Sequence, residues 1–108
     1  MNDGDAVFKP IYKKIAEDFA FLSDYDYRFE CNWIHHVHPS VKFKSNKEGL
    51  SIGFDREENR MTLYRYIPAE AYSGIDMLKG ISLTGKKYKD QVEQVKEILL
   101  KVLKEFGS

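Results

Sequence analysis

The chain has few cysteines and prolines and no excess of charge of either sign. Cys31 is the only cysteine, which excludes an internal disulfide and a zinc cluster built from several thiolates. Lys and Arg number 17, and so do Asp and Glu, so the balanced charge argues against duplex nucleic acid as the main partner. No apolar run of 18 residues is present, so we expect no membrane span.

The composition is that of one folded domain. A length of 108 residues with 43% hydrophobic residues, including seven Phe and seven Tyr, suffices for one core but not for two. The glycines match neither a phosphate-binding loop nor a dinucleotide fingerprint, so we expect no cofactor. The acidic start, residues 1–5, lacks the apolar run of a secretory signal and, with the single cysteine, favours a cytoplasmic protein.

Apolar residues at helical spacing mark both ends of the chain. Because proline is tolerated mainly in the first helical turn, we expect the first helix to begin at Lys9 or Pro10 and to end near Ser23 and Asp24. Its apolar stripe comprises Phe8, Ile11, Tyr12, Ile15, Phe19 and Leu22. The stripe of the last helix comprises Tyr88, Val92, Val95, Leu99, Val102 and Phe106, with Gly107 as its stop.

Between the helices the apolar spacing changes to two, which is typical of strands. The first strand is expected from Tyr27 to Val37, with an apolar core face formed by Tyr27, Phe29, Cys31, Trp33, His35 and Val37. Pro39 is expected to end or kink it. Three more strands follow at residues 41–44, 50–55 and 61–67, and a short fifth strand is expected at residues 81–83. A helical turn is expected at residues 69–72.

Short polar connections between consecutive strands predict an antiparallel meander of four or five strands. The whole chain, residues 1–108, therefore predicts a single α+β domain with the order helix, meander, helix. Because both helices need an apolar surface and the sheet has one apolar face, we expect both helices on that face. The opposite face is then open to water or to a partner.

Histidines form the one local cluster with metal-binding chemistry. His36 and His38 would share a face of the first strand, and neutral imidazole is a common metal ligand. A metal site, or a metalloenzyme built on it, needs further ligands that the sequence does not single out, so two solvated histidines are the favoured interpretation. Cys31 is expected to be a buried packing residue, which argues against a nucleophilic role.

Tyrosines mark the open face of the fourth strand. Met61 and Leu63 would face the core, with Arg65 interrupting that row, and Tyr64 and Tyr66 would face away. Tyrosine is enriched at protein interfaces, so we predict a partner-binding surface that comprises Tyr64, Tyr66, His36 and His38. Its partner would be another protein or a second copy of the chain. Two alternatives remain: tyrosines paired across strands within a monomer, and single-stranded nucleic acid stacked beside Arg28, Lys42 and Lys44.

Three segments, Asp18–Tyr25, Pro39–Phe43 and Leu50–Asp55, together resemble small uncharacterised bacterial α+β proteins in which a helix leads into a meander. Some of those proteins resemble immunity proteins, which neutralise a neighbouring toxin. The resemblance implies a bacterial binding protein rather than an enzyme, and it assigns no functional residue. We therefore expect a non-catalytic module that acts by occluding a partner.

Overall fold

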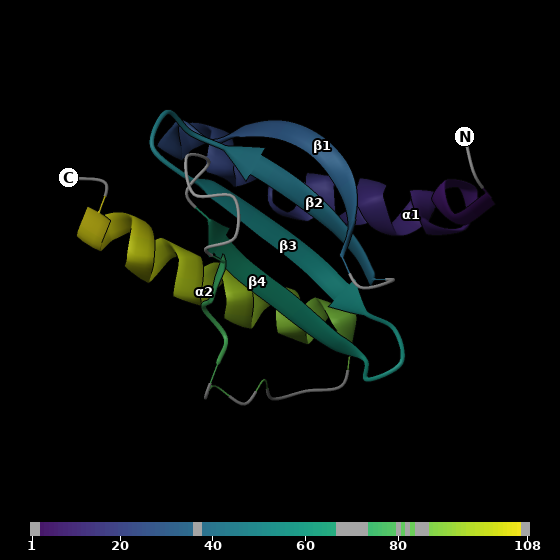
Figure 1. The fold of residues 1–108 in the computed structure, drawn as a ribbon. Helices are drawn as coiled ribbons and strands as arrows, with labels where there is room; N and C mark the ends of the chain where they lie inside the picture. Colours follow the sequence, from purple (N-terminus) through teal and green to yellow (C-terminus); the bar gives the residue numbers. More distant parts are fainter. Residues whose placement is uncertain are drawn as a thin grey trace.

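A computed structural model describes residues 3–35, 38–66, 74–79, 81, 83 and 87–106. Their order along the chain is helix, five strands, helix (Figure 1). The elements are α1 (Asp3–Asp18), a 3-10 helix η1 (Ala20–Tyr25), β1 (Arg28–His35), β2 (His38–Lys44), β3 (Gly49–Asp55), β4 (Arg60–Tyr66), β5 (Gly74–Asp76) and α2 (Tyr88–Phe106).

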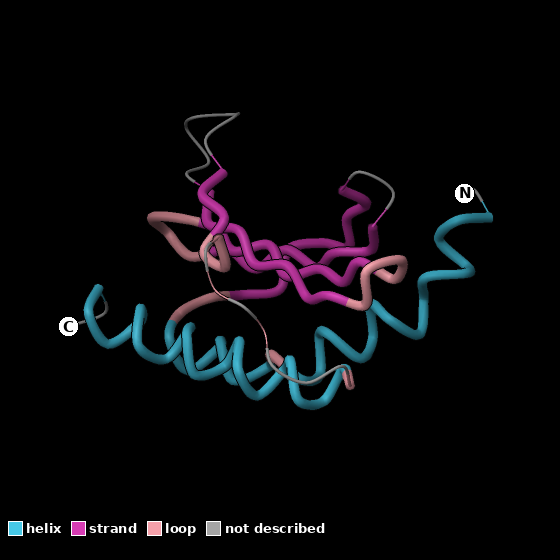
Figure 2. Tube along the Cα trace, turned by 90° about the horizontal axis from the view of Figure 1, so that it is seen from below, coloured by secondary structure: helices cyan, strands magenta, loops and turns pink. Residues whose placement is uncertain are grey.

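The five strands form one antiparallel sheet in the order β1-β2-β3-β4-β5. Figure 2 shows both helices on the same side of this sheet, where α1 packs against β2 and α2 against β4. The α+β class, the meander and the two-layer arrangement that the sequence predicts are thus confirmed. One face of the sheet, which we call the outer face, is turned away from both helices.

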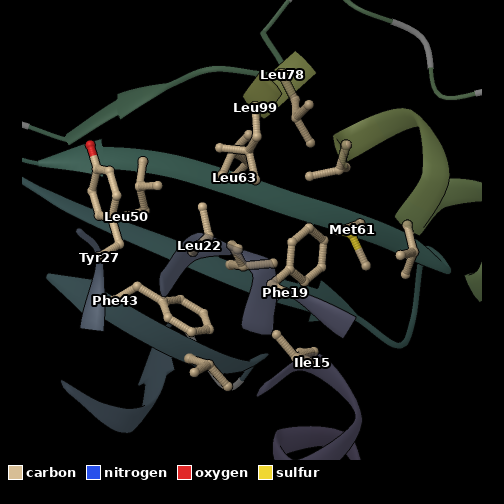
Figure 3. Close-up of a cluster of buried hydrophobic side chains, with 14 of the residues drawn as sticks. Ile15, Phe19, Leu22, Tyr27, Phe43, Leu50, Met61, Leu63, Leu78 and Leu99 are labelled. Atoms are coloured by element: carbon tan, nitrogen blue, oxygen red, sulfur yellow. The ribbon is translucent and has the colours of Figure 1, made fainter. Parts of the chain in front are cut away.

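The core lies between the sheet and the helices (Figure 3). Alternate residues of the strands supply the sheet side of this core, because successive side chains of a strand point to opposite faces. The strands contribute Val41, Phe43, Leu50, Ile52, Met61 and Leu63 to the hydrophobic core, and the helical segments contribute Tyr12, Ile15, Phe19, Leu22, Val92, Val95, Leu99 and Leu103. Among the described side chains, most members of the two predicted apolar stripes therefore pack toward the sheet.

The N-terminal helix differs from its prediction at both ends. It begins at Asp3, so Pro10 lies inside the helix rather than in its first turn. An interior proline removes one backbone hydrogen bond, which weakens a helix without preventing it from forming. The α-helix ends at Asp18 and is followed by η1, which ends at Tyr25; the next residue, Asp26, has the left-handed conformation. A tighter 3-10 turn still places Leu22 in the core, which is why helical spacing alone did not reveal the change.

Two strand predictions are wrong in position. Pro39 lies within β2, opposite Ile34 of β1, rather than at a break. The fifth strand is Gly74–Asp76, whereas Ile81 and Leu83 lie outside any strand. The helical turn expected at residues 69–72 and the stop at residue 107 lie outside the described residues.

A buried glutamine joins α2 to the β3–β4 hairpin. The Gln91 side-chain carbonyl accepts a hydrogen bond from the backbone N–H of Met61 at 2.7 Å, and its amide donates to the carbonyl of Asn59, also at 2.7 Å. Asn59 has a positive φ of 52°, so this contact supports the turn where the backbone is least favourable. Among the described residues, no helix has the length and apolar character needed to cross a membrane.

Candidate functional site

The outer face carries three of the four residues predicted to bind a partner. Lys42, Ser51 and Tyr64 stand opposite one another across β2, β3 and β4. Tyr66 and His38 lie on the same face, because residues two or four apart along a strand point the same way. His36 lies outside the described residues. The binding role of these residues stays a prediction.

A β-bulge in β1 changes which of its residues face outward. The pairing with β2 shifts between Phe29, opposite Phe43, and Cys31, opposite Lys42, so Glu30 is an extra residue. The prediction that Phe29, Cys31 and Trp33 share the core face is therefore wrong. Phe29 remains on the helix side, whereas Cys31, which is half-buried, moves to the outer face beside Lys42.

Trp33 follows Cys31 to the outer face and is 46% exposed. The ammonium of Lys42 lies 4.1 Å from the centre of the Trp33 ring and 5.0 Å from the centre of the Tyr66 ring. The Tyr66 hydroxyl donates a hydrogen bond of 2.8 Å to Glu30 at the bulge. Trp33, Lys42, Tyr66 and Glu30 thus form one cluster, the outer-face cluster, in which two rings are held by a shared cation.

The electrostatics of the outer-face cluster favour a neutral tyrosine. Burial raises the pKa of the Tyr66 hydroxyl, and its hydrogen bond to Glu30 and the charge of that carboxylate raise it further. The Tyr66 hydroxyl therefore acts as a hydrogen-bond donor to Glu30. This bond links β4, which carries Tyr66, to β1, which carries Glu30.

Small residues make room for this arrangement. A Cβ atom at Gly49 would collide with the Tyr66 ring, so glycine lets that ring lie flat across β3 and reach β1. A Cβ atom at Gly53 would meet the hydroxyls of Ser40 and Thr62, at 2.7 Å for the latter. Glycine at positions 49 and 53 therefore leaves room on β3 for the Tyr66 ring and for the hydroxyls of Ser40 and Thr62.

His38 lies toward the other end of the outer face, in an ion-pair position with Asp55. Its Nε2 atom is 3.5 Å from a carboxylate oxygen of Asp55, and both side chains are partly buried. Within the parts of the chain that the structure describes, no three His, Cys, Asp or Glu side chains gather as a metal site. Since His36 is outside those parts, the metal hypothesis on His36 and His38 stays an untested prediction.

A second polar cluster lies on the helix side of the sheet and explains Arg65. The Arg65 side chain donates to the buried carboxylate of Glu48, whose other oxygen accepts from the Tyr27 hydroxyl. Burial and the bond to Glu48 raise the pKa of Tyr27. Beside this trio is a hollow of about 330 Å³ that Tyr25 and Leu103 also line. The polar groups of Tyr27, Glu48 and Arg65 bind one another, and we therefore assign this trio to the stability of the fold.

Sequence reasoning found the tyrosines of β4 and placed Lys42 near them, but it missed Trp33 and Glu30 as their neighbours. An alternating pattern carries no mark of an extra residue, so nothing in residues 27–35 signals that Trp33 changes face. Gly49, on the neighbouring strand, is the one usable signal, because a glycine inside a strand often marks a close approach. Comparison with family models, curated proteins and solved structures returned no match.

Proposed function

We propose that this protein is a non-catalytic binding module that occludes a surface of a partner protein with its outer face. The observation that supports the proposal most is the exposed Trp33 ring, held with Tyr66 by Lys42 on the side of the sheet that both helices leave open. Tryptophan and tyrosine dominate interface energetics because each buries a large area and loses few rotamers.

The chemistry of the outer-face cluster fits a protein surface. Its rings offer apolar contact, while Lys42, Glu30 and the Tyr66 hydroxyl offer polar contacts of both signs at its rim. Because the rings are already packed in place, binding would cost little additional side-chain entropy. Occlusion is also how the immunity-type proteins that the sequence resembles would act, and it needs no reactive group.

The proposal is tested on the partner that wild-type protein captures in its host, by measuring the affinity of that purified partner by calorimetry. Replacing Tyr64 and Tyr66 together by alanine should weaken binding by more than about 2 kcal/mol, roughly 30-fold. Trp33→Ala, at an exposed position that folding needs less, should weaken it comparably.

Substitutions on the solvent side of α2 provide the matched control. Glu93→Ala and Lys101→Ala change exposed residues of the helix layer and should leave the affinity within about twofold, since they lie far from the outer face. Circular dichroism would establish that each variant is folded. Unchanged affinity in both the tyrosine pair and Trp33→Ala would refute binding through the outer face.

A further inference from the structure

The two outermost strands of the described sheet differ sharply. β5 has three residues, whereas β1 has eight and exposes apolar side chains on both of its faces. Phe29 is 55% exposed and Ile34 37% exposed on the helix side, and Trp33 is exposed on the outer face. Natural proteins shorten, charge or cover their edge strands, because a free edge pairs readily with another strand. β1 is eight residues long, and no described helix or strand other than β2 packs closely against it.

We propose that β1 pairs, in antiparallel orientation, with β1 of a second copy of this chain, joining two five-stranded sheets into one. Antiparallel pairing of identical strands has twofold symmetry, so each contact occurs twice. With Glu30 counted as the extra residue of the bulge, full overlap places Asn32 on the twofold axis, opposite Asn32 of the second copy.

This register matches the exposed apolar side chains to one another. Phe29 stands opposite Ile34 of the second copy on the helix side, and Cys31 stands opposite Trp33 on the outer face. Directly opposed residues share a face, as these pairs require. A slip of two positions in one direction leaves Ile34 without an opposite residue, and a slip in the other direction does the same to Phe29. Full overlap therefore covers all three.

Charge and area support a second copy as the occupant. In full overlap no two acidic or two lysine or arginine side chains face each other, because Arg28 stands opposite His35 and Glu30 is held by Tyr66. The exposed parts of the three apolar side chains amount to roughly 300 Å² per copy. A standard interface buries about 800 Å² per partner, so the edge contact predicts a weak dimer that forms at high concentration.

Sedimentation velocity over a concentration series tests this pairing, from about 1 µM to about 300 µM. Wild-type protein should shift from monomer to dimer as concentration rises. Ile34→Lys should raise the dimer dissociation constant at least about tenfold, since it places a charge in the apolar pair with Phe29. The matched control is Ile75→Lys, the same change on the opposite edge at a residue that is 61% exposed, and it should leave the constant unchanged.

A cysteine on the axis tests the register. Opposed residues have Cα atoms about 4.5–5.5 Å apart, within disulfide range, so Cys31→Ser with Asn32→Cys should form a covalent dimer under mild oxidation. Cys31→Ser alone, and Cys31→Ser with Ile75→Cys, should not. A wild-type protein that stays monomeric, a dimer insensitive to Ile34→Lys, or crosslinking only through residue 75 would overturn the proposal. The pairing covers part of Trp33 but leaves Tyr64 and Tyr66 uncovered, so the Tyr64/Tyr66 double variant tests the proposed binding function whether or not the dimer forms.

Discussion

The two faces of this sheet come from the same strands but carry different kinds of side chains. The helix-facing side holds large apolar side chains on β2, β3 and β4, all buried except the partly buried Phe54, whereas the outer face holds serine and glycine beside a few large side chains. Each face has one tyrosine bonded to one glutamate: Tyr27 to Glu48 inside, and Tyr66 to Glu30 outside.

This difference between the two faces separates side chains that stabilise the fold from side chains that could bind a partner. Side chains on the helix face are fixed by contacts from two layers, so each is expected to matter for stability. Large side chains on the outer face are ordered by a few local contacts, so we expect them to matter more for binding. Four pairs of substitutions test this division.

Leu63 and Thr62 are adjacent on β4 and point to opposite faces, so they compare the two sides most directly. Leu63→Ala should lower the free energy of unfolding by about 2–5 kcal/mol, because Leu63 is fully buried among helix and strand side chains. Thr62→Ala should lower it by less than about 1 kcal/mol. Urea unfolding measures both. Equal losses would show that the outer face is packed as tightly as the core.

Gly49 tests how much order the outer face has. Gly49→Ala should displace the Tyr66 ring and break its bond to Glu30, lowering the free energy of unfolding by about 1–3 kcal/mol. Trp33, the only tryptophan, should report the change through its fluorescence, because Lys42 links it to Tyr66. Ser51→Ala, on the same strand and face, is the control. An unaltered Trp33 signal in Gly49→Ala would contradict the linkage.

The helix face was largely predictable from sequence, and the outer face only in part. Met61 and Leu63 alternate with residues of the outer face, and α2 has a regular apolar stripe, so the core and its two layers follow from spacing. Trp33 was misplaced because one unpaired residue, Glu30, reverses the alternation beyond it, and a bulge has no pattern of its own in a single strand.

Long-range polar contacts escaped sequence reasoning for a different physical reason. Arg65 stood out as a charge in an apolar row, but its partner Glu48 is 17 positions earlier, in the turn before β3. The register of the meander brings them together, and no local spacing encodes that distance. The same holds for Tyr66 and Glu30, which are 36 positions apart.

Unfolding measured at alkaline pH compares the two tyrosine–glutamate pairs. Both tyrosines have raised pKa values in the folded state, so above about pH 10 the unfolded chain loses those protons first and the free energy of unfolding falls as pH rises. Each fully buried tyrosine contributes up to about 1.4 kcal/mol per pH unit. Below pH 10 its contribution is complete.

Phenylalanine variants separate the two contributions, by urea unfolding between pH 9 and pH 11. Tyr27→Phe should reduce the dependence of unfolding free energy on alkaline pH more than Tyr66→Phe does, because Tyr27 is almost fully buried whereas Tyr66 is only partly buried. An equal reduction would mean that the outer-face pair is as shielded from water as the inner one.

Lys42 is expected to have the smallest effect on stability and the clearest effect on the exposed ring. A cation beside an exposed ring contributes about 0.5–1 kcal/mol, so Lys42→Ala should change the free energy of unfolding by no more than this. It should nevertheless increase quenching of Trp33 fluorescence by acrylamide, because the lysine side chain covers one side of that ring. Lys47→Ala, an exposed lysine in the β2–β3 turn, should change neither quantity. If Lys42→Ala destabilised the protein as much as Leu63→Ala, the outer-face cluster would be part of the core rather than a surface held ready for a partner.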